Sequence, residues 1–255
     1  MAFDEWMLSV VAGHPGTLIA RLYTWGVGSI TFGHNQRCET ALDHEAVGDT
    51  PVIRRVTGGR AVYHDLSELT YAIAFNTDTP PCPALRGSSG ETSKAIALML
   101  SQFLTRLGVT ADWVKVSDTQ NSRPAYFHKA ACFDSHARYE LANGRSKLVA
   151  SARRDWGGAA LQHGSIKLHG VAPHAALKMD SANRRTPSKA IAITELKQAA
   201  SVFGATIGDR FGVKADEFPL SSSARDWIAA RALLVEKSPL DRRDLIAQSA
   251  PLFSL

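Results

Sequence analysis

A cysteine and a lysine on either side of a turn are the residues best suited to covalent chemistry in this sequence. Cys132 precedes Lys147 by fifteen residues, and Asn143-Gly144-Arg145 between them is typical of a turn that joins neighbouring strands. A thiol is a strong nucleophile only as its thiolate, and a nearby ammonium favours that anion. The spacing is therefore compatible with Cys132 as a nucleophile and Lys147 as its acid/base partner. The alternative is a cysteine that packs as a small apolar residue.

A second candidate is the segment RRVTGGRAVYHD, residues 54–65. Its adjacent glycines, Gly58 and Gly59, carry no Cβ, so the backbone there can approach a ligand and direct N–H groups at an oxyanion or a carbonyl oxygen. Thr57 and His64 could add hydrogen bonds from their side chains. The segment is neither a phosphate loop of the GxxxxGK type nor a GxGxxG loop. A simple hairpin turn is the alternative interpretation.

A third candidate is the polar step His163-Gly164-Ser165 inside an apolar run. A glycine within a strand often marks a place where a ligand or another backbone comes close. The step therefore indicates a side chain or a stretch of backbone that faces a ligand. The alternative role of this histidine is that of a buried structural residue.

The strands and helices that would position these residues follow from hydrophobic periodicity and from turn residues. The pattern predicts two strands within 18–33 that meet at a turn, followed by a meander. Ser88 and Glu91 match a capping box, so a helix should begin there and end at Gly108. The remaining strands are expected at 52–56, 61–64, 69–76, 109–116 and, as a hairpin, 147–153 and 159–168, and the remaining helices at 194–204 and 224–237.

Antiparallel hairpins together with segregated helices indicate an α+β fold rather than alternating βαβ units. We expect a mixed, largely antiparallel sheet that is flanked by helices. Residues 1–189 would form the main domain, and residues 190–255 would form a helical C-terminal extension packed on the same domain.

Composition narrows the class of protein. The chain has 255 residues, of which 45% are hydrophobic and 21% charged, and can bury a sizeable core. Its formal net charge of +5 is spread over short basic pairs, so no nucleic-acid partner is expected. Three widely spaced cysteines predict free thiols, with neither a disulfide framework nor a metal site. No membrane span and no secretory leader are expected, which indicates a cytoplasmic protein.

Taken together, the three candidate stretches resemble the biotin/lipoate A/B protein ligase superfamily in their order and separations. RRVTGGRAVYHD is similar to its signature loop, and LYTW at 22–25 with TFGHNQ at 31–36 resembles the strand pair that precedes it. The likeness covers residues 2–170 or so. It implies that residues 1–189 have the fold of the lipoate and biotin ligase catalytic domain and act as an acyltransferase.

Within that superfamily, two places are similar to the octanoyltransferases that use an acyl-thioester enzyme. Gly-Gly-Arg at 58–60 and Cys-Phe at 132–133 stand where ATP-dependent lipoate ligases typically carry a third glycine and an Asn-Asp pair. The resemblance implies that Cys132 takes an octanoyl group from octanoyl-acyl carrier protein and that Lys147 lowers the thiol pKa. The acceptor would be the lysine of a lipoyl domain, in a glycine-cleavage H protein or a dehydrogenase subunit. No cofactor is implied, because a thioester is already activated.

The resemblance also implies where the acyl group is held. Main-chain donors around 58–60 and at Ser151-Ala152 would bind the carbonyl oxygen. Val62, Tyr71 and Val149 would wall a narrow tunnel for the chain, their alternative role being core. The expected substrate-binding residues are Arg55, Thr57, Gly58, Gly59, Arg60, Ala61, Val62, Tyr63, His64, Tyr71, Val149, Ser151, Ala152, His163, Gly164 and Ser165.

One departure from the family pattern bears on substrate choice. Ala150-Ser151-Ala152-Arg153 stands where the family commonly has Gly-Ser-Ala-Gln. The methyl group of Ala150 narrows the approach to the backbone, and Arg153 adds a charge. An altered acyl chain or an unusual acceptor domain is therefore compatible with the sequence.

Three other functions compete with an acyltransferase. The first is an ATP-dependent lipoate ligase, which would need a nucleotide and Mg²⁺ and would survive loss of the thiol. The second is a noncatalytic protein that binds lipoyl domains, which the presence of both Cys132 and Lys147 disfavours. The third and more remote one is a biotin ligase, whose signature loop has a different arrangement.

Overall fold

The described residues form two sheets. The structure is a computed structural model and describes residues 1–37, 42–113, 141–143, 146–169, 174–177, 192–214, 216 and 220–237. The larger sheet has the strand order β1-β5-β9-β8-β7-β6, with every neighbouring pair antiparallel. Its strands are β1 (Leu18–Tyr23), β5 (Leu69–Asn76), β6 (Asp112–Trp113), β7 (Leu141–Asn143), β8 (Ser146–Trp156) and β9 (Ala159–Ile166).

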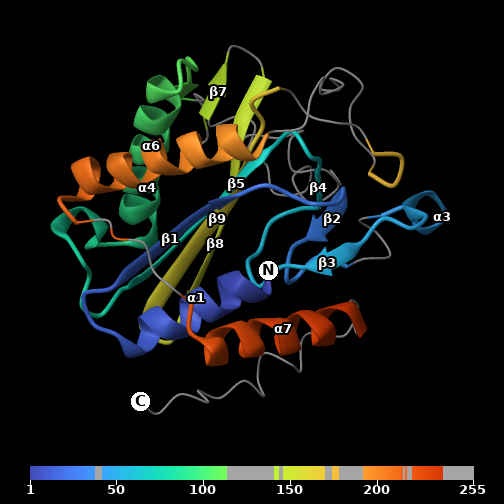
Figure 1. Ribbon diagram of the computed structural model, residues 1–255, viewed down its shortest axis with the longest axis horizontal. Coiled ribbons are helices and arrows are strands. Elements are labelled where there is room, and N and C mark those ends of the chain that lie inside the picture. The colour runs from blue at the N-terminus through green and yellow to red at the C-terminus, as the bar shows by residue number, and fades with distance from the viewer. Residues whose placement is uncertain are drawn as a thin grey trace.

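Helices cover both faces of this sheet (Figure 1). They are α1 (Ala2–Gly13), α4 (Ser89–Arg106), α6 (Ile193–Phe211) and α7 (Ser222–Lys237). The described residues also form the short helix α3 (His44–Val47) and the 3-10 helix η1 (Pro83–Leu85). On one face α1 packs against β5 and β9, and α7 packs on α1. On the other face α4 and α6 pack on each other. The expected α+β class, with a largely antiparallel sheet flanked by helices, is confirmed.

Each face of the sheet buries its own apolar cluster. Because side chains alternate along a strand, Tyr71, Ile73 and Phe75 of β5 lie in the cluster beside α4, whereas Ala72 and Ala74 lie in the cluster beside α1.

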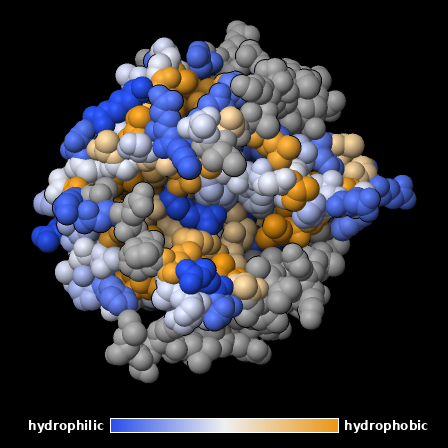
Figure 2. All heavy atoms as spheres, viewed as in Figure 1, coloured by the Kyte–Doolittle hydropathy of each residue, from blue (hydrophilic) through white to orange (hydrophobic). Residues whose placement is uncertain are grey.

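Figure 2 shows that apolar residues also reach the surface near the middle of the molecule, whereas hydrophilic residues cover α3 at the right edge. Among the described residues, no helix has both the length and the apolar character needed to cross a membrane.

The second sheet corrects one expectation about the double-glycine segment. Its strands are β2 (Ser29–Phe32), β3 (Val52–Arg54) and β4 (Val62–His64), in the order β3-β2-β4. β2 is parallel to β3 and antiparallel to β4. The segment between β3 and β4 therefore crosses over β2 and is not a hairpin turn. The two strands expected within 18–33 exist, but β1 joins the large sheet and β2 the small one.

Several local expectations are confirmed. Ser88 and Glu91 form the capping box of α4, with the Ser88 N–H donating to Glu91 Oε2 at 2.8 Å. β8 and β9 form the expected hairpin, closed by Gly157 and Gly158 with φ of 56° and 74°. The expected helices of the C-terminal part are present as α6 and α7. The division of the chain at residue 190 stays a prediction.

Two departures concern the ends of the expected pattern. α1 was not among the helices expected from the sequence. The strand expected at 109–116 begins at Asp112, and its residues after Trp113 lie outside the described part of the chain.

The close pairing of β8 with β9 leads to a first prediction. A Cβ added at Gly164 would overlap the carbonyl oxygen of Ala150 and lie 2.9 Å from the Tyr71 ring. Gly164→Ala should therefore lower the free energy of unfolding by about 1–3 kcal/mol, because the backbone of β8 must shift. Urea titration measures this as a lower midpoint at an unchanged m-value.

The matched control is Gly204→Ala in α6, where an added Cβ meets nothing within 4 Å. That change should raise the free energy of unfolding by about 0.5–1 kcal/mol, because glycine in a helix costs conformational entropy. A Gly164→Ala protein as stable as the wild type would contradict the described register of β8 and β9.

Candidate active site

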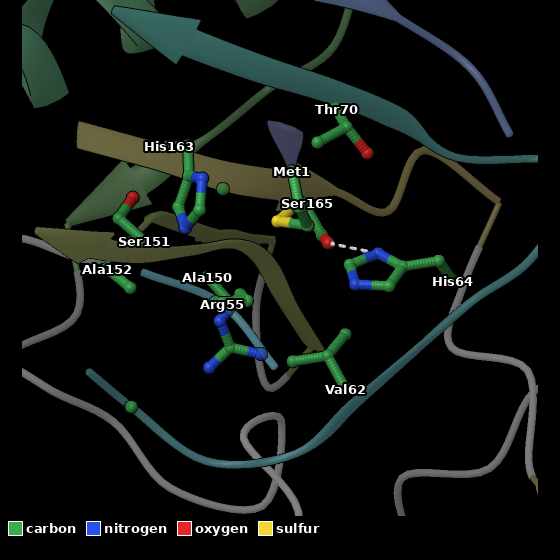
Figure 3. A pocket seen from close by; sticks show the side chains of 12 residues that line it. Met1, Arg55, Val62, His64, Thr70, Ala150, Ser151, Ala152, His163 and Ser165 are labelled. Carbon is green, nitrogen blue, oxygen red and sulfur yellow. Dashed lines mark hydrogen bonds between the residues drawn. The ribbon is translucent and has the colours of Figure 1, made fainter. Parts of the chain in front are cut away.

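A pocket opens between the large sheet and the small one. It holds about 380 Å³ of empty space, counting the open solvent at its mouth. The residues lining it are Met1, Arg55, Gly59, Val62, His64, Thr70, Ala150, Ser151, Ala152, His163, Gly164 and Ser165. Figure 3 shows His163 and Ser165 projecting from β9 into the space in front of Arg55 and Val62. Small and apolar groups form much of the wall, which suits an apolar ligand.

Many of the expected residues meet at this pocket. Those that line it are Arg55, Gly59, Val62, His64, Ser151, Ala152, His163, Gly164 and Ser165. Five others, Thr57, Gly58, Arg60, Ala61 and Tyr63, belong to the adjoining segment but not to the described lining.

Three expected residues lie elsewhere or outside the described part. Tyr71 and Val149 are core residues, the alternative role considered for them, because both pack in the cluster beside α4. The hydroxyl of Tyr71 lies 2.7 Å from Ser151 Oγ, so Ser151 turns its side chain toward that same face. Cys132 lies outside the described residues.

The double-glycine loop is the stretch 55–61 between β3 and β4. Arg55 and two glycines hold its shape. The Arg55 guanidinium donates to the carbonyl oxygens of Gly58 and Arg60, at 3.0 and 2.8 Å. Gly59 has a φ of 92°, in the region that favours glycine. A Cβ at Gly33 would overlap the carbonyl oxygen of Gly59, so the loop lies directly over the end of β2.

His163 connects this loop to α1. Its Nδ1 lies 2.9 Å from Asp4 Oδ2, and its Nε2 lies 2.6 Å from Thr57 Oγ1. All three side chains are buried. Burial lowers the pKa of His163 and outweighs the opposite effect of Asp4. For Asp4, burial favours the neutral acid, but Arg21 and His163 outweigh it and lower the pKa. The pair is therefore a neutral imidazole beside a carboxylate.

His64 has the same kinds of partner on the other side of the pocket. Its Nδ1 lies 2.6 Å from Glu68 Oε1, and its Nε2 lies 2.6 Å from Thr31 Oγ1. Thr31 Oγ1 in turn accepts a hydrogen bond from Arg55 at 2.8 Å. Trp25 stacks on the His64 ring, with centroids 4.2 Å apart. Burial lowers the pKa of His64 despite the nearby carboxylate of Glu68, so this imidazole is neutral as well.

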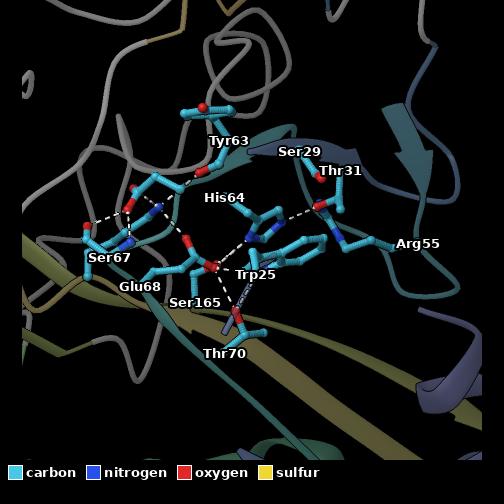
Figure 4. A network of polar contacts seen from close by, with 12 residues as sticks. Trp25, Ser29, Thr31, Arg55, Tyr63, His64, Ser67, Glu68, Thr70 and Ser165 are labelled. Carbon is cyan, nitrogen blue, oxygen red and sulfur yellow. Dashed lines mark hydrogen bonds and ion pairs between the residues drawn. The ribbon is translucent and has the colours of Figure 1, made fainter. Parts of the chain in front are cut away.

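A buried ion cluster supports His64 (Figure 4). Lys167 Nζ donates to Asp65 Oδ2 and to the carbonyl oxygen of Tyr63, each at 2.9 Å, and pairs with Glu68 Oε2. Burial would lower the pKa of Lys167, but the two carboxylates outweigh it and raise that pKa. Burial would likewise raise the pKa of Glu68, but His64 and Lys167 outweigh it and lower that pKa to about 2. The cluster therefore carries its full charges at neutral pH.

The strand register puts Lys147 on the pocket side of the large sheet, although Lys147 is not among the residues that line the pocket. The register of β7 and β8 shifts between Leu141 and Ala142, so a bulge adds one residue to β8 beside Lys147. Leu148 and Val149 consequently both pack in the cluster beside α4. Alternation then turns Lys147 to the opposite face, which carries the pocket. The side chain is buried there, with the residue 5% exposed.

The two departures from the family pattern lie on different faces of β8. Arg153 donates to Thr92 Oγ1 of α4 at 2.8 Å and pairs with Asp155 at 2.7 Å, so its charge points away from the pocket. Ala150 lines the pocket. Of these two residues, Ala150 is the one that changes the shape of the wall.

Sequence reasoning missed the residues that hold the site in place. Asp4, Thr31, Glu68 and Lys167 make the contacts described above. Glu68 and Lys167 each stand next to an apolar strand, where a charged residue signals a buried partner. That signal does not identify the partner, since only the pairing of β5 with β9 brings the two residues together.

Comparisons with known proteins agree with this geometry. Residues 1–201 match the family described as the lipoyl protein ligase A/B catalytic domain. The chain is 38% identical over 175 residues to octanoyltransferase LipM of Kyrpidia tusciae, covering 66% of this chain and 61% of that protein. It is 37% identical over 190 residues to octanoyltransferase LipM of Moorella thermoacetica, covering 71% and 65%. The chain thus spans less than two thirds of the length of these relatives.

A solved structure shares the fold. The crystal structure of lipoate-protein ligase A bound with ATP matches with a TM-score of 0.65 and 20% identity, over 90% of this chain and 86% of the other. At that identity the likeness shows the fold alone. The resemblance found in the sequence motifs is nevertheless confirmed, because the family match covers far more than half of the chain. The chain belongs to the lipoyl protein ligase A/B catalytic domain family.

Proposed function

We propose that this protein is an octanoyltransferase, which moves an octanoyl group from acyl carrier protein through a Cys132 thioester to the lysine of a lipoyl domain. The observation that carries the proposal is the placement of a buried lysine, Lys147, on the face of the sheet that carries the pocket. Cys132 stands fifteen residues before it in the sequence. The relatives named octanoyltransferase support the octanoyl group as cargo.

The proposed chemistry needs no nucleotide. The Cys132 thiolate adds to the thioester carbonyl, and the carrier thiolate leaves and takes up a proton. The lysine amine of the acceptor then adds to the Cys132 thioester, loses a proton, and expels the Cys132 thiolate. Lys147 is the proposed group that favours the thiolate and moves that proton.

The pocket is suited to hold the acyl chain and its carbonyl group. Val62, Ala150 and Ala152 offer an apolar wall, and Gly59 brings the backbone of the double-glycine loop to the pocket. Main-chain N–H groups of that loop would hold the oxyanion that forms when the thiolate adds. We therefore assign the expected substrate-binding residues that line the pocket, other than His64 and His163, to the acyl group and its carbonyl.

The acceptor and the donor follow from the same proposal. A glycine-cleavage H protein or a dehydrogenase subunit would supply the lipoyl domain. The competing function is an ATP-dependent lipoate ligase, whose fold this chain shares. The test is intact-mass spectrometry after incubation with octanoyl-acyl carrier protein: a transferase gains one octanoyl group without ATP, and a ligase does not.

Lys147 provides a second prediction, which concerns the thiol itself. Lys147→Ala should slow alkylation of Cys132 by iodoacetamide near neutral pH by on the order of tenfold, because less of the thiol is ionised without the ammonium. The measurement is the pH dependence of the alkylation rate, whose midpoint should move to higher pH.

The control is Lys214→Ala, which removes a lysine whose side chain is 86% exposed. It should leave the alkylation profile of the wild type unchanged. An identical profile in Lys147→Ala and the wild type would remove Lys147 from its proposed role, even if the protein still transfers octanoyl groups.

A further inference from the structure

Two buried histidines beside the pocket have matching surroundings. His163 lies between the carboxylate of Asp4 at Nδ1 and the hydroxyl of Thr57 at Nε2. His64 lies between the carboxylate of Glu68 at Nδ1 and the hydroxyl of Thr31 at Nε2. Both rings border the pocket, where a histidine would ordinarily be assigned to proton transfer or to ligand binding.

The partners fix where the proton sits on each ring. An ionised carboxylate only accepts hydrogen bonds, so Nδ1 of each histidine must carry the hydrogen. A neutral ring then has a lone pair at Nε2, which accepts the hydroxyl hydrogen of the threonine. In both rings the two nitrogens are therefore engaged within the protein, and neither is available to a substrate.

Both threonines lead to the double-glycine loop. Thr57 belongs to the loop, so the bond to His163 ties the loop to β9 and, through Asp4, to α1. Thr31 Oγ1, having given its hydrogen to His64, accepts from Arg55 at 2.8 Å. The same guanidinium donates to the carbonyl oxygens of Gly58 and Arg60.

We infer that His64 and His163 are positioning residues, which fix the double-glycine loop through Thr31 with Arg55 and through Thr57, and which transfer no proton. This deepens the proposed function and rests on it, since the loop matters for catalysis only if it holds the acyl carbonyl. The loop has a φ of 92° at Gly59, and its backbone bonds to the end of β2 and to His34 at Arg55 and Thr57, so the two threonine contacts add side-chain support at the same places.

The proton positions can be measured without any activity. In wild-type protein labelled with ¹⁵N at histidine, both rings should show a protonated Nδ1 and an unprotonated Nε2 throughout about pH 6 to 8. A hydrogen on Nε2 of either ring, or a titration of either ring near the ordinary histidine pKa, would overturn the inference. This outcome does not depend on whether the protein is a transferase.

Threonine variants test the link to the loop. Thr57→Val keeps the shape of the side chain but removes the hydroxyl, and Thr57→Ser keeps the hydroxyl. We expect Thr57→Val to lower the rate of Cys132 acylation by about 10- to 100-fold, the effect of a small misplacement of catalytic groups, and Thr57→Ser to retain most of the rate. Alkylation of Cys132 by iodoacetamide should be unchanged in both, because it uses no oxyanion donor.

Thr31→Val and Thr31→Ser repeat the comparison at the second histidine, so the test survives if one valine variant does not fold. Thr105→Val is the control, because the hydroxyl of Thr105 donates to the carbonyl oxygen of Ser101 within α4, away from the pocket. Acylation of Thr57→Val and Thr31→Val at the wild-type rate would overturn the inference, as would serine variants no faster than the valine variants. If the wild type forms no acyl adduct, the proposed function fails, and the histidine spectra still decide the inference.

Discussion

Cys132→Ala is expected to abolish the acyl adduct that the wild-type protein forms with octanoyl-acyl carrier protein in the absence of ATP. Removing the nucleophile of a covalent relay leaves only the binding groups, so transfer to a lipoyl domain should fall by on the order of 10³-fold or more. Intact-mass spectrometry of both proteins measures the adduct, and the mass of the lipoyl domain measures the transfer. The effect should reach both steps, because each of them passes through the same thioester.

The matched control is Cys82→Ala, which removes a cysteine that is buried in the core cluster beside α4, on the face away from the pocket. It should keep the octanoyl adduct, with only the modest loss of stability that a small cavity brings. If Cys132→Ala still modifies a lipoyl domain, and does so only with ATP, the protein is a ligase and the thioester mechanism is wrong.

The sequence predicted the elements of the site better than their arrangement. Local signals, namely glycine pairs, a capping box and apolar periodicity, predicted several elements. These are the strands β3 and β4 on either side of Gly58-Gly59, the hairpin of β8 and β9, and the capped helix α4. Such signals depend on neighbours in the sequence, which a single chain displays directly. They do not say which strands pair across the fold.

Three features of the site depend on long-range pairing and were therefore missed. The double-glycine loop was compared with a hairpin turn, although β2 lies between the strands that it joins. The bulge that turns Lys147 to the pocket face depends on the register of β7 against β8, which alternation alone does not give. Tyr71 and Val149 were expected to line a tunnel. They lie in the core cluster beside α4, and the sequence does not show which helices pack on their face of the sheet.

The ion cluster is the clearest case, because its members are apart in the sequence and together in the fold. Glu68 and Lys167 are separated by 99 residues, and their pairing requires β5 and β9 to be neighbours. Their charges nevertheless signalled a constraint, since a charge next to a buried strand must find a partner. A substitution there should consequently have a large effect on stability.

Lys167→Met is expected to lower the free energy of unfolding at neutral pH by about 3–5 kcal/mol, the usual cost of leaving a buried charge without its partner. The side chain of Lys167 is fully buried, and its removal leaves the carboxylates of Asp65 and Glu68 facing each other across a low-dielectric space. Urea titration measures the loss. Lys214→Met, which changes a lysine with an 86% exposed side chain, should be close to neutral.

The pH dependence of stability distinguishes an unpaired buried charge from a packing defect, because only the unpaired charge changes how tightly the folded protein binds protons. In the wild type, Glu68 has its pKa lowered from 4.5 to about 2, so its contribution is present above pH 4.5 and is lost as the pH falls toward 2. Without Lys167, the folded His64–Glu68 pair should take up a proton more readily than in the wild type, because Lys167 lowers the pKa of both groups. Relative to the wild type, the stability of Lys167→Met should therefore rise as the pH falls from 7 toward 5. In the wild type the lowered pKa values of His64 and His163 have the opposite effect, because the unfolded chain binds protons more readily at these residues. The double variant Lys167→Met with Glu68→Gln should lose this pH dependence and recover part of the stability, because the amide carries no charge. A single variant whose stability changes with pH over this range in the same way as that of the wild type would show that Glu68 is not the charge that Lys167 neutralises.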